Sequence, residues 1–295
     1  MNSIQFVPVN AANLRAFVDV THETLWSPVW PGADAVAQDF WRWPSESQAA
    51  AHLITCRSEL IGRVVMPQLD DYLIIRDLGV RAAHAARVVD ALVQRAATHR
   101  ARTVRAIVHE PLSDAFVARG FAEQKRRITM RHDLRGVPGP MLTLPVRHVS
   151  DHADRDGMDI GELMHEAYRG TVDDEDEPRA VWTLHAHDVL GSHYGVFLDT
   201  ASFVTPPTPP FYSATLVIES APRSAVLGQV VTRRSHTNRG YARCLIMLSL
   251  AALAARDYHE CFLEATTTNA NAMHLYRVLG FRPSGPQIVY SVRHL

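Results

Sequence analysis

Residues 230–245 read VVTRRSHTNRGYARCL, and this stretch places a glycine between the end of a strand and the start of an apolar helix. The β-branched run at its beginning predicts a strand, and the apolar residues that follow predict a helix over residues 243–255. Gly240 lies in the loop between them, where the missing Cβ lets the backbone approach a ligand closely. Because the first N–H groups of a helix have no intrahelical partner, this loop is a candidate anion-binding site.

The next informative stretch, residues 263–281, reads LEATTTNANAMHLYRVLGF and predicts a strand followed by a short helix. Asn269 is placed as the N-cap of that helix, and Gly280 stands where a left-handed residue ends it. Tyr276 falls on the apolar face of the helix. Such a tyrosine is either a core aromatic or a phenol held in place for chemistry, and spacing alone leaves both readings open.

Working outward, the 295 residues predict two domains of ordinary size. The formal net charge of −1 gives no electrostatic footprint for nucleic acid or for an anionic membrane surface, so the expected partner is a small molecule. Three widely spaced cysteines in no CxxC arrangement, and no signal peptide at the N-terminus, favour a cytoplasmic protein. The most apolar run, residues 245–255, is shorter than the ~20 residues of a membrane span.

Each half of the chain has the same order of elements: strands, one long helix, a strand, one short helix and a strand. The long helices are predicted at residues 86–98 and 243–255, and the final strands at 128–132 and 288–292. This repetition predicts an α/β (α+β) fold made of two tandem domains, each with a mixed, mostly antiparallel sheet flanked by helices. The predicted boundaries are residues 1–135 and 141–295, joined by a Gly/Pro-rich linker at 136–140.

The two motifs together resemble the signature of the GNAT N-acetyltransferase superfamily. The first motif corresponds to Thr237, Gly240 and Ala242, and the second to Asn269, Ala272, Tyr276, Gly280 and Phe281. Thr237 departs from the Arg or Gln that the family prefers, which implies weaker cofactor binding. The resemblance implies acetyl-CoA as co-substrate and splayed central strands in the second domain. The residues it assigns to acetyl-CoA are Val230, Val231, Thr232, Thr237, Asn238, Arg239, Gly240, Tyr241, Ala242, Arg243 and Asn269.

The first half resembles the same fold without its chemistry. Phe116 stands four residues before Gly120, where Tyr276 stands before Gly280 in the second half. The loop at residues 79–87 (GVRAAHAAR) has alanines where the second half has its pyrophosphate glycine. We therefore expect a structural or substrate-shaping domain. The tandem layout is similar to that of mycothiol synthase, a similarity of layout and not of substrate.

The resemblance also implies a mechanism in which an amine attacks the thioester directly. Tyr276 would act as the general acid that protonates the departing thiolate, since a phenol with an ordinary pKa near ~10 keeps its proton at neutral pH. The backbone at residues 230–232 would donate to the oxyanion. The general base stays open among Glu264, Glu219 and a relayed water. No metal is expected, because the histidines at positions 185, 187 and 193 match no ligand spacing.

The acceptor is expected to be a primary amine of a small, cationic metabolite. Residues 167–177 (AYRGTVDDEDE) include Asp173, Asp174 and Glu175, which either bind a cationic substrate or form a solvated surface. In GNAT proteins the connection after the first helix borders the acceptor site, which supports the first reading. Two alternatives remain: acetylation of a peptide or protein amine, and a catalytically silent acyl-CoA-binding regulator.

Overall fold

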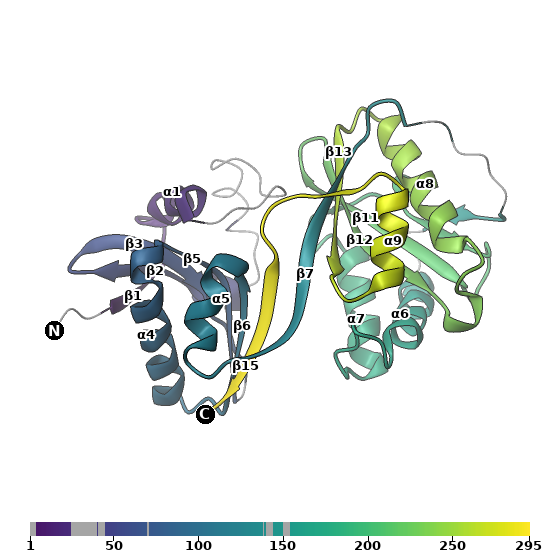
Figure 1. Ribbon diagram of the computed structural model, residues 1–295. Helices are drawn as coiled ribbons and strands as arrows, with labels where there is room; N and C mark the ends of the chain where they lie inside the picture. The colour runs from purple at the N-terminus through teal and green to yellow at the C-terminus, as the bar shows by residue number, and fades with distance from the viewer. Residues whose placement is uncertain are drawn as a thin grey trace. The chain divides into compact units, whose positions relative to one another are not determined.

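The computed structural model describes residues 4–24, 40, 45–69, 71–137, 139, 144–149 and 154–295. They belong to two compact units, the first made of Met1–Ile128 and Gly285–Leu295 and the second of Thr129–Ser284. Each unit contains a mixed sheet with helices packed against it (Figure 1). This architecture confirms the predicted α/β fold built from two similar halves.

The sheet of the first unit has one parallel strand pair. Its order is β1 (Ile4–Pro8), β2 (Ala51–Cys56), β3 (Glu59–Val65), β5 (Tyr72–Val80), β6 (Thr103–His109), β15 (Ile288–His294) and β7 (Ala122–Asp133), with β4 (Gln68–Leu69) beside β5. Among the described strands of this unit, β5 and β6 run parallel and the other pairs are antiparallel. One core joins β2, β3, β5 and β6 to α4 (Ala85–Thr98) and α5 (Glu110–Val117), and a second joins β2 and β3 to α1 (Leu14–Thr24). The short α3 (Ser45–Ala49) precedes β2, and η1 (Ala82–His84) precedes α4.

In the sheet of the second unit, the C-terminal part of β7 is the strand at one edge. It continues through β13 (Glu260–Thr266), β12 (Ser224–Thr232), β11 (Ser213–Ala221), β10 (Phe203–Thr205) and β8 (Arg147–His148). The short β9 (Val196–Phe197) pairs with β11, and β14 (Arg282–Pro283) pairs with β7. α6 (Asp154–Tyr168) and α7 (Arg179–Leu190) share one core with β11 and β12. α8 (Tyr241–Ala254) also contacts these two strands, and α9 (Ala270–Val278) contacts β13.

The central strands of the second unit splay apart, as predicted. β12 pairs with β13 only from Ser224 to Val226, so the rest of β12 has no β13 partner. A register shift against β11 leaves Gly228 without a partner in the β11 ladder. Such a bulge bends its strand, which helps to part β12 from β13.

The final strand corrects the predicted domain boundary. The sequence interpretation placed residues 141–295 in one domain, but β15 pairs on one side with β6 and on the other with β7, all within the first unit. Val289 and Ser291, which belong to both ladders, are 1% and 5% exposed. A strand paired along both edges and buried along one face satisfies most of its backbone groups, which favours this position.

The region between the halves lies partly outside the described residues. Of the predicted linker at 136–140, Pro138 and Pro140 are outside them. The first described strand after the linker, β8, begins at Arg147. α7 was not predicted at all, because its apolar residues show weak helical periodicity and two of them, Val181 and Leu184, are exposed.

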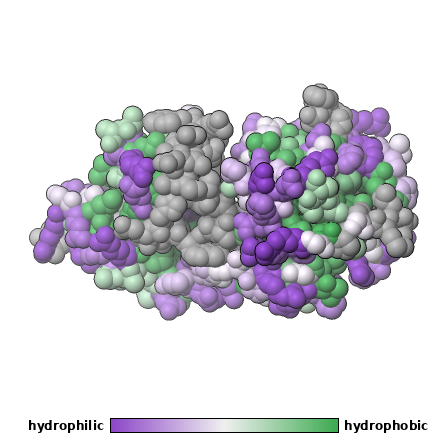
Figure 2. Space-filling view, turned by 90° about the horizontal axis from the view of Figure 1, so that it is seen from above, coloured by the Kyte–Doolittle hydropathy of each residue, from purple (hydrophilic) through white to green (hydrophobic). Residues whose placement is uncertain are grey.

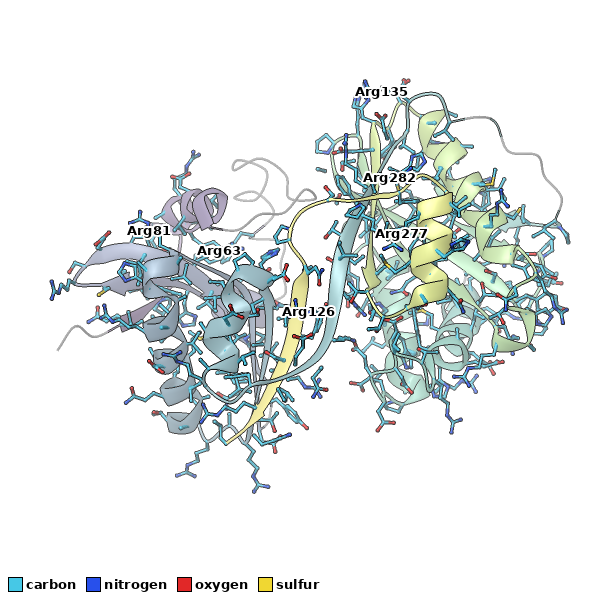
Figure 3. All side chains as sticks on the ribbon, in the orientation of Figure 1. Arg63, Arg81, Arg126, Arg135, Arg277 and Arg282 are labelled. Atoms are coloured by element: carbon cyan, nitrogen blue, oxygen red, sulfur yellow. The ribbon has the colours of Figure 1, made fainter. Side chains whose placement is uncertain are left out.

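Charged side chains on β7 find partners close to them in the fold. Arg126 (Figure 3) pairs with Glu110 at 2.8 Å and with Glu123 at 2.7 Å. The face of the molecule in Figure 2 mixes hydrophilic and hydrophobic residues, in keeping with the hydrophobic fraction of 47% in the sequence. Among the described helices, none has the length and apolarity needed to cross a membrane.

Candidate functional site

The loop between β12 and α8 has the conformation that the glycine motif predicts. β12 ends at Thr232, the 3-10 turn η3 (Arg234–His236) follows, and Gly240 is the N-cap of α8. Gly240 has φ +81°, a left-handed conformation that glycine adopts without strain, and a Cβ built on it would meet nothing within 4 Å. The glycine is therefore needed for backbone conformation, and the space in front of it is open.

The cations of this loop have two different roles. Arg233 pairs with Glu166 and also donates to the carbonyl of Phe211, and Arg234 donates to the carbonyl of Arg169. These two arginines thus hold the loop against the rest of the second unit. Arg239 and Arg243 are exposed, and neither guanidinium makes a hydrogen bond to the part of the chain that the structure describes. They are the cations left for an anion at the start of α8.

The last residues of β12 are hydrogen-bonded to β11. Ser213 donates to the carbonyl of Val231 at 2.7 Å, and its hydroxyl lies 2.8 Å from that of Thr232. Val231 is buried at 2% exposure, whereas Val230 and Thr232 are half-buried. Since β13 has already diverged, the backbone edge of residues 230–232 that faces away from β11 is free to donate to a ligand.

Of the other residues assigned to the cofactor, all but Asn269 belong to the same loop and to the first turns of α8. Asn238 has φ +61°, and Thr237 donates through its hydroxyl to the carbonyl of Arg234 at 3.0 Å. Tyr241 and Ala242 form the first turn of α8, where the backbone N–H groups precede the first i→i−4 bond. Asn269 lies elsewhere, at the start of α9.

Tyr276 lies on the buried face of α9. Asn269 caps the helix by accepting from the N–H of Ala272 at 3.1 Å, and Phe281 packs edge-on against the Tyr276 ring with centroids 6.0 Å apart. The Tyr276 side chain is 8% exposed. Burial first, and then the nearby Asp173 carboxylate, raise the pKa of Tyr276 above its ordinary value. The phenol therefore keeps its proton throughout the neutral range.

The acidic segment meets the start of α9, and two of its carboxylates are engaged by the protein. Asp173 accepts from the Thr266 hydroxyl at 2.5 Å and from the Asn269 amide at 3.0 Å. Asp174 accepts from the N–H groups of Gly170 and Asp176, and these bonds lower the pKa of its carboxyl. Asp173 therefore ties the acidic segment to the helix that carries Tyr276, and Asp174 shapes the segment itself. Glu175 is exposed.

The two candidate bases occupy unequal positions. Glu219 pairs with Ala225, while Thr232 pairs with Ser213 at the other end of the same ladder. Ala225 and Thr232 are seven positions apart along β12, about 23 Å at ~3.3 Å per residue, so Glu219 lies far from the cofactor loop. Burial, and then the charge and hydrogen bond of the Glu219 carboxylate, raise the pKa of Tyr258 to about 12. Glu219 is thus already engaged by a tyrosine at this end of the sheet. Glu264 is exposed on β13, two residues beyond the last one paired with β12.

Sequence reasoning missed a hydrogen-bonded row of side chains beside the splayed part of β12. Tyr168 donates to Gln229 Oε1 at 2.6 Å, and Gln229 Nε2 lies 3.1 Å from His185 Nε2. His185 Nδ1 lies 3.4 Å from the hydroxyl of Tyr194. Trp182 stacks on Tyr168 with centroids 4.9 Å apart. The row depends on α7, so only the recognition of that helix could have placed His185 opposite Gln229.

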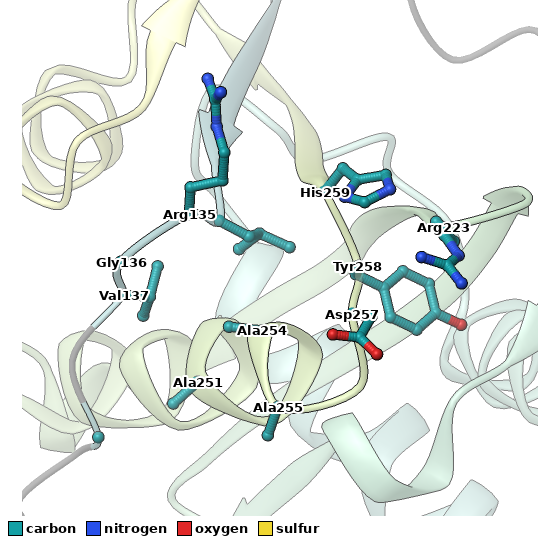
Figure 4. A pocket seen from close by; sticks show the side chains of 12 residues that line it. Arg135, Gly136, Val137, Arg223, Ala251, Ala254, Ala255, Asp257, Tyr258 and His259 are labelled. Carbon is teal, nitrogen blue, oxygen red and sulfur yellow. The ribbon is translucent and has the colours of Figure 1, made fainter.

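A pocket of the second unit lies away from this chemistry. It has a volume of about 510 Å³ and is lined by residues that include Arg135, Arg223, Ala255 and Tyr258 (Figure 4). These residues surround the C-terminal end of α8, and the 14 residues of this helix separate them from Gly240 by about 21 Å at ~1.5 Å per residue. The pocket is therefore not the site that the motifs predict.

The arrangement fits an anionic cofactor with a reactive group between β12 and β13. The open left-handed glycine, the N–H groups that begin α8 and two exposed arginines suit a pyrophosphate. The free edge of β12 and the protonated Tyr276 suit a reaction that develops an oxyanion and expels a leaving group needing a proton. Among the described residues, no three His, Cys, Asp or Glu side chains gather as a metal site.

Part of the chain matches a family model, and the whole chain matches solved structures. Residues 158–281 match the family model described as the acetyltransferase (GNAT) family. The fold matches a GCN5-related N-acetyltransferase from Sphaerobacter thermophilus with a TM-score of 0.72 and 15% identity, over 99% of this chain and 95% of that one. A tandem GNAT protein from the clavulanic acid biosynthesis pathway matches with a TM-score of 0.68 and 17% identity, over 99% and 98%.

A GNAT-family acetyltransferase from Colwellia psychrerythraea matches with a TM-score of 0.60 and 11% identity, over 99% of this chain and all of that one (100%). No curated protein matches the chain in sequence. At identities this low the structural matches establish a shared fold, which extends over both units.

Proposed function

We propose that this chain, whose residues 158–281 form a domain of the GNAT acetyltransferase family, transfers the acetyl group of acetyl-CoA to a primary amine of a small, cationic metabolite. One observation carries the proposal: a cofactor loop around Gly240 and a buried, protonated Tyr276 flank the splayed strands of the same unit. The N–H groups and the two exposed arginines at the start of α8 would hold the pyrophosphate. The free edge of β12 would stabilise the oxyanion.

The reaction needs no covalent enzyme intermediate. The neutral amine attacks the thioester carbonyl, the C–S bond breaks, and Tyr276 gives its proton to the departing thiolate. Because burial raises the pKa of the Tyr276 phenol, the tyrosine is protonated before the step. The leaving group is a thiolate whose conjugate acid has an ordinary pKa near ~8.5. The transfer is completed when the tyrosine recovers a proton from the amine or from solvent, so that proton number is conserved.

Negative charge beside the start of α9 supports a cationic acceptor. Asp173, Asp174 and Glu175 lie together in one segment, and Asp173 contacts Thr266 at the end of β13. A carboxylate that already accepts two hydrogen bonds still has lone pairs for an ammonium. The aromatic faces of Tyr168 and Trp182 on α6 and α7 would add attraction for a cation.

The test of the reaction is the release of CoA thiol from acetyl-CoA in the presence of single amines. The panel comprises glucosamine, spermidine, lysine, an aminoglycoside and a short peptide with a free N-terminus, each with the wild-type chain and with Tyr276→Phe. We expect one class of small cationic amine to give release well above hydrolysis. Preference for the peptide would favour the first alternative, and the absence of release above hydrolysis with every amine of the panel would favour the silent regulator.

The test of acceptor charge uses Glu175, because replacing Asp173 or Asp174 would also disturb the segment's internal hydrogen bonds. Exposed charge pairs contribute about 0.2–1 kcal/mol, so Glu175→Gln should raise the KM of the preferred amine by up to ~5-fold and leave acetyl-CoA affinity unchanged. Added salt should weaken amine binding more in the wild type than in the variant. Glu59→Gln, which removes an exposed carboxylate of the first unit, is the matched control. An unchanged amine KM would refute a role for this charge.

A further inference from the structure

Resting on the proposed function, three rings beside the cofactor loop point to a contact that lies largely outside the two motifs: we propose that Tyr212, His236 and Tyr241 bind the adenine base of CoA. Tyr241 is the first residue of α8, directly after Gly240, and His236 ends the turn η3. Tyr212 immediately precedes β11. The rings thus come from three segments that meet at the loop where the pyrophosphate would lie.

The three rings contact one another and form an aromatic cluster. The rings of Tyr212 and His236 are stacked, with centroids 3.8 Å apart and an interplanar angle of 14°. The Tyr241 ring is inclined to both, with its centroid 6.0 Å from that of Tyr212 and 5.9 Å from that of His236. A stacked pair of rings can extend its stack with a further ring, and every nucleobase has a flat face for this contact. The cluster therefore has the form of a platform for a base.

The cluster does not belong to the apolar cores of the second unit. All three side chains are half-buried, and the cores around α6, α7 and α8 are built from other residues. His236 Nδ1 lies 2.9 Å from Ser235 Oγ. In the part of the chain that the structure describes, nothing hydrogen-bonds His236 Nε2 or the hydroxyls of Tyr212 and Tyr241. These polar tips can donate to or accept from the edge of a purine, which carries ring nitrogens and an amino group.

The position of the cluster relative to β12 fits the shape of CoA. β13 has diverged from one edge of β12, so the pantetheine arm would enter there, toward Tyr276. Tyr212 lies on the other edge of β12, because the residue after it, Ser213, pairs with Thr232 at the end of that strand. In CoA the pantetheine arm and the adenosine are attached to different phosphates of the pyrophosphate. With the pyrophosphate at Gly240, the adenosine can turn to the β11 side while the thioester enters the splayed strands.

Other contacts already hold the loop against the rest of the unit. Arg233 pairs with Glu166, and Arg234 donates to the carbonyl of Arg169. The aromatic cluster is therefore not the loop's sole attachment, and its part-exposed rings are available to a ligand. A contact with the base would make the chain select intact acetyl-CoA over thioesters that lack the nucleotide.

Calorimetry with two simple probes isolates the contribution of the base. ADP contains the adenosine and the pyrophosphate of CoA, whereas inorganic pyrophosphate supplies the anion without the nucleoside. His236→Leu removes the flat ring and keeps an apolar side chain. It should raise the Kd of ADP and of CoA by ~5–150-fold, the range expected for one lost stacking contact, and leave the Kd of pyrophosphate unchanged. His236→Phe restores a ring face and should recover most of the affinity for ADP.

A second histidine on an aromatic ring provides the matched control. His148 on the edge strand β8 packs against the Phe203 ring with centroids 4.6 Å apart. His148→Leu should change none of the three Kd values. A His236→Leu chain that binds ADP as the wild type does would overturn the contact with the base. Equal losses for ADP and pyrophosphate would overturn it too, because they would show that the ring only shapes the loop.

These titrations contain no amine, so they separate this inference from the proposed reaction. A wild-type chain that binds CoA with an affinity indifferent to His236→Leu would overturn the adenine contact alone. A chain that shows the contact but acetylates none of the amines would overturn the proposed reaction alone. A wild-type chain that does not bind CoA at all would overturn both.

Discussion

The two units build the same helix end from different side chains. In the second unit Tyr276 packs edge-on against Phe281, whose N–H donates to the Tyr276 carbonyl, and Gly280 between them has φ +96°. In the first unit Phe116 packs edge-on against Phe121 with centroids 5.0 Å apart, the same backbone bond forms, and Gly120 has φ +78°. Both units therefore pack an aromatic ring at this position, and the hydroxyl of Tyr276 is what distinguishes the second unit from the first.

The loops before the long helices differ more. Eight residues, 233–240, separate β12 from α8, whereas four residues, 81–84, separate β5 from α4. The N-cap of α4 is His84 with φ −108°, so the left-handed glycine has no counterpart there. The strand divergence is nevertheless retained, since β5 pairs with β6 only from Tyr72 to Ile75. The first unit has kept the splayed sheet and lost the loop that would hold a pyrophosphate.

The largest effect should come from placing a charged side chain at the cofactor loop. Gly240→Asp forces an L residue into the left-handed region and puts a negative charge where the pyrophosphate would lie, so acetyl-CoA binding should be lost. Titration calorimetry measures this directly. Gly120→Asp in the first unit imposes the same backbone strain at an equally open position and should leave binding intact.

The same calorimetry sharpens the comparison through its stoichiometry. Because the first unit lacks the long loop and its glycine, the wild-type chain should bind one acetyl-CoA, with Gly240→Asp removing it entirely. Two equivalent sites in the wild type, or half of the binding retained in the variant, would mean that the shortened loop still holds a cofactor.

The next effect concerns the hydroxyl that distinguishes the two helix ends. Tyr276→Phe gives the second unit the ring of the first, so packing should survive while turnover falls by ~10²–10⁴-fold. Because burial raises the pKa of Tyr276, the wild-type turnover should show no loss of the acid form below pH 9. Acetyl-CoA affinity should not change. Turnover equal to that of the wild type, with chemistry shown to be rate-limiting, would remove the general-acid role.

The smallest effect concerns the caps of the two short helices. α9 is capped by the Asn269 side chain, which also binds Asp173, whereas His109, the N-cap residue of α5, makes no side-chain cap hydrogen bond. Asn269→Ala should destabilise the second unit by about 1 kcal/mol, measured as faster amide exchange in α9. His109→Ala should leave exchange in α5 nearly unchanged. Equal effects on the two helices would show that the cap does not distinguish them.

Much of the fold was available from the sequence because it depends on local order. The glycine–helix and asparagine–helix motifs fix backbone conformations within a few residues, so the loop at Gly240, the cap at Asn269 and the face of Tyr276 were all predicted where the structure has them. The repeated order of elements likewise predicted two similar units. α7 escaped prediction because exposed Val181 and Leu184 blur its apolar stripe.

What tertiary structure alone decided is pairing between segments far apart in the chain. The residues of a strand predict that it is extended, but they do not predict which strands it pairs with. Only the tertiary structure therefore placed β15 between β6 and β7. The engagement of Asp173 with Thr266 and Asn269 has the same origin, across more than 90 residues of chain. His185 and Gln229, separated by 44 positions, meet because α7 and β12 share one core. Such contacts follow from how packed elements meet in space, which no local pattern encodes.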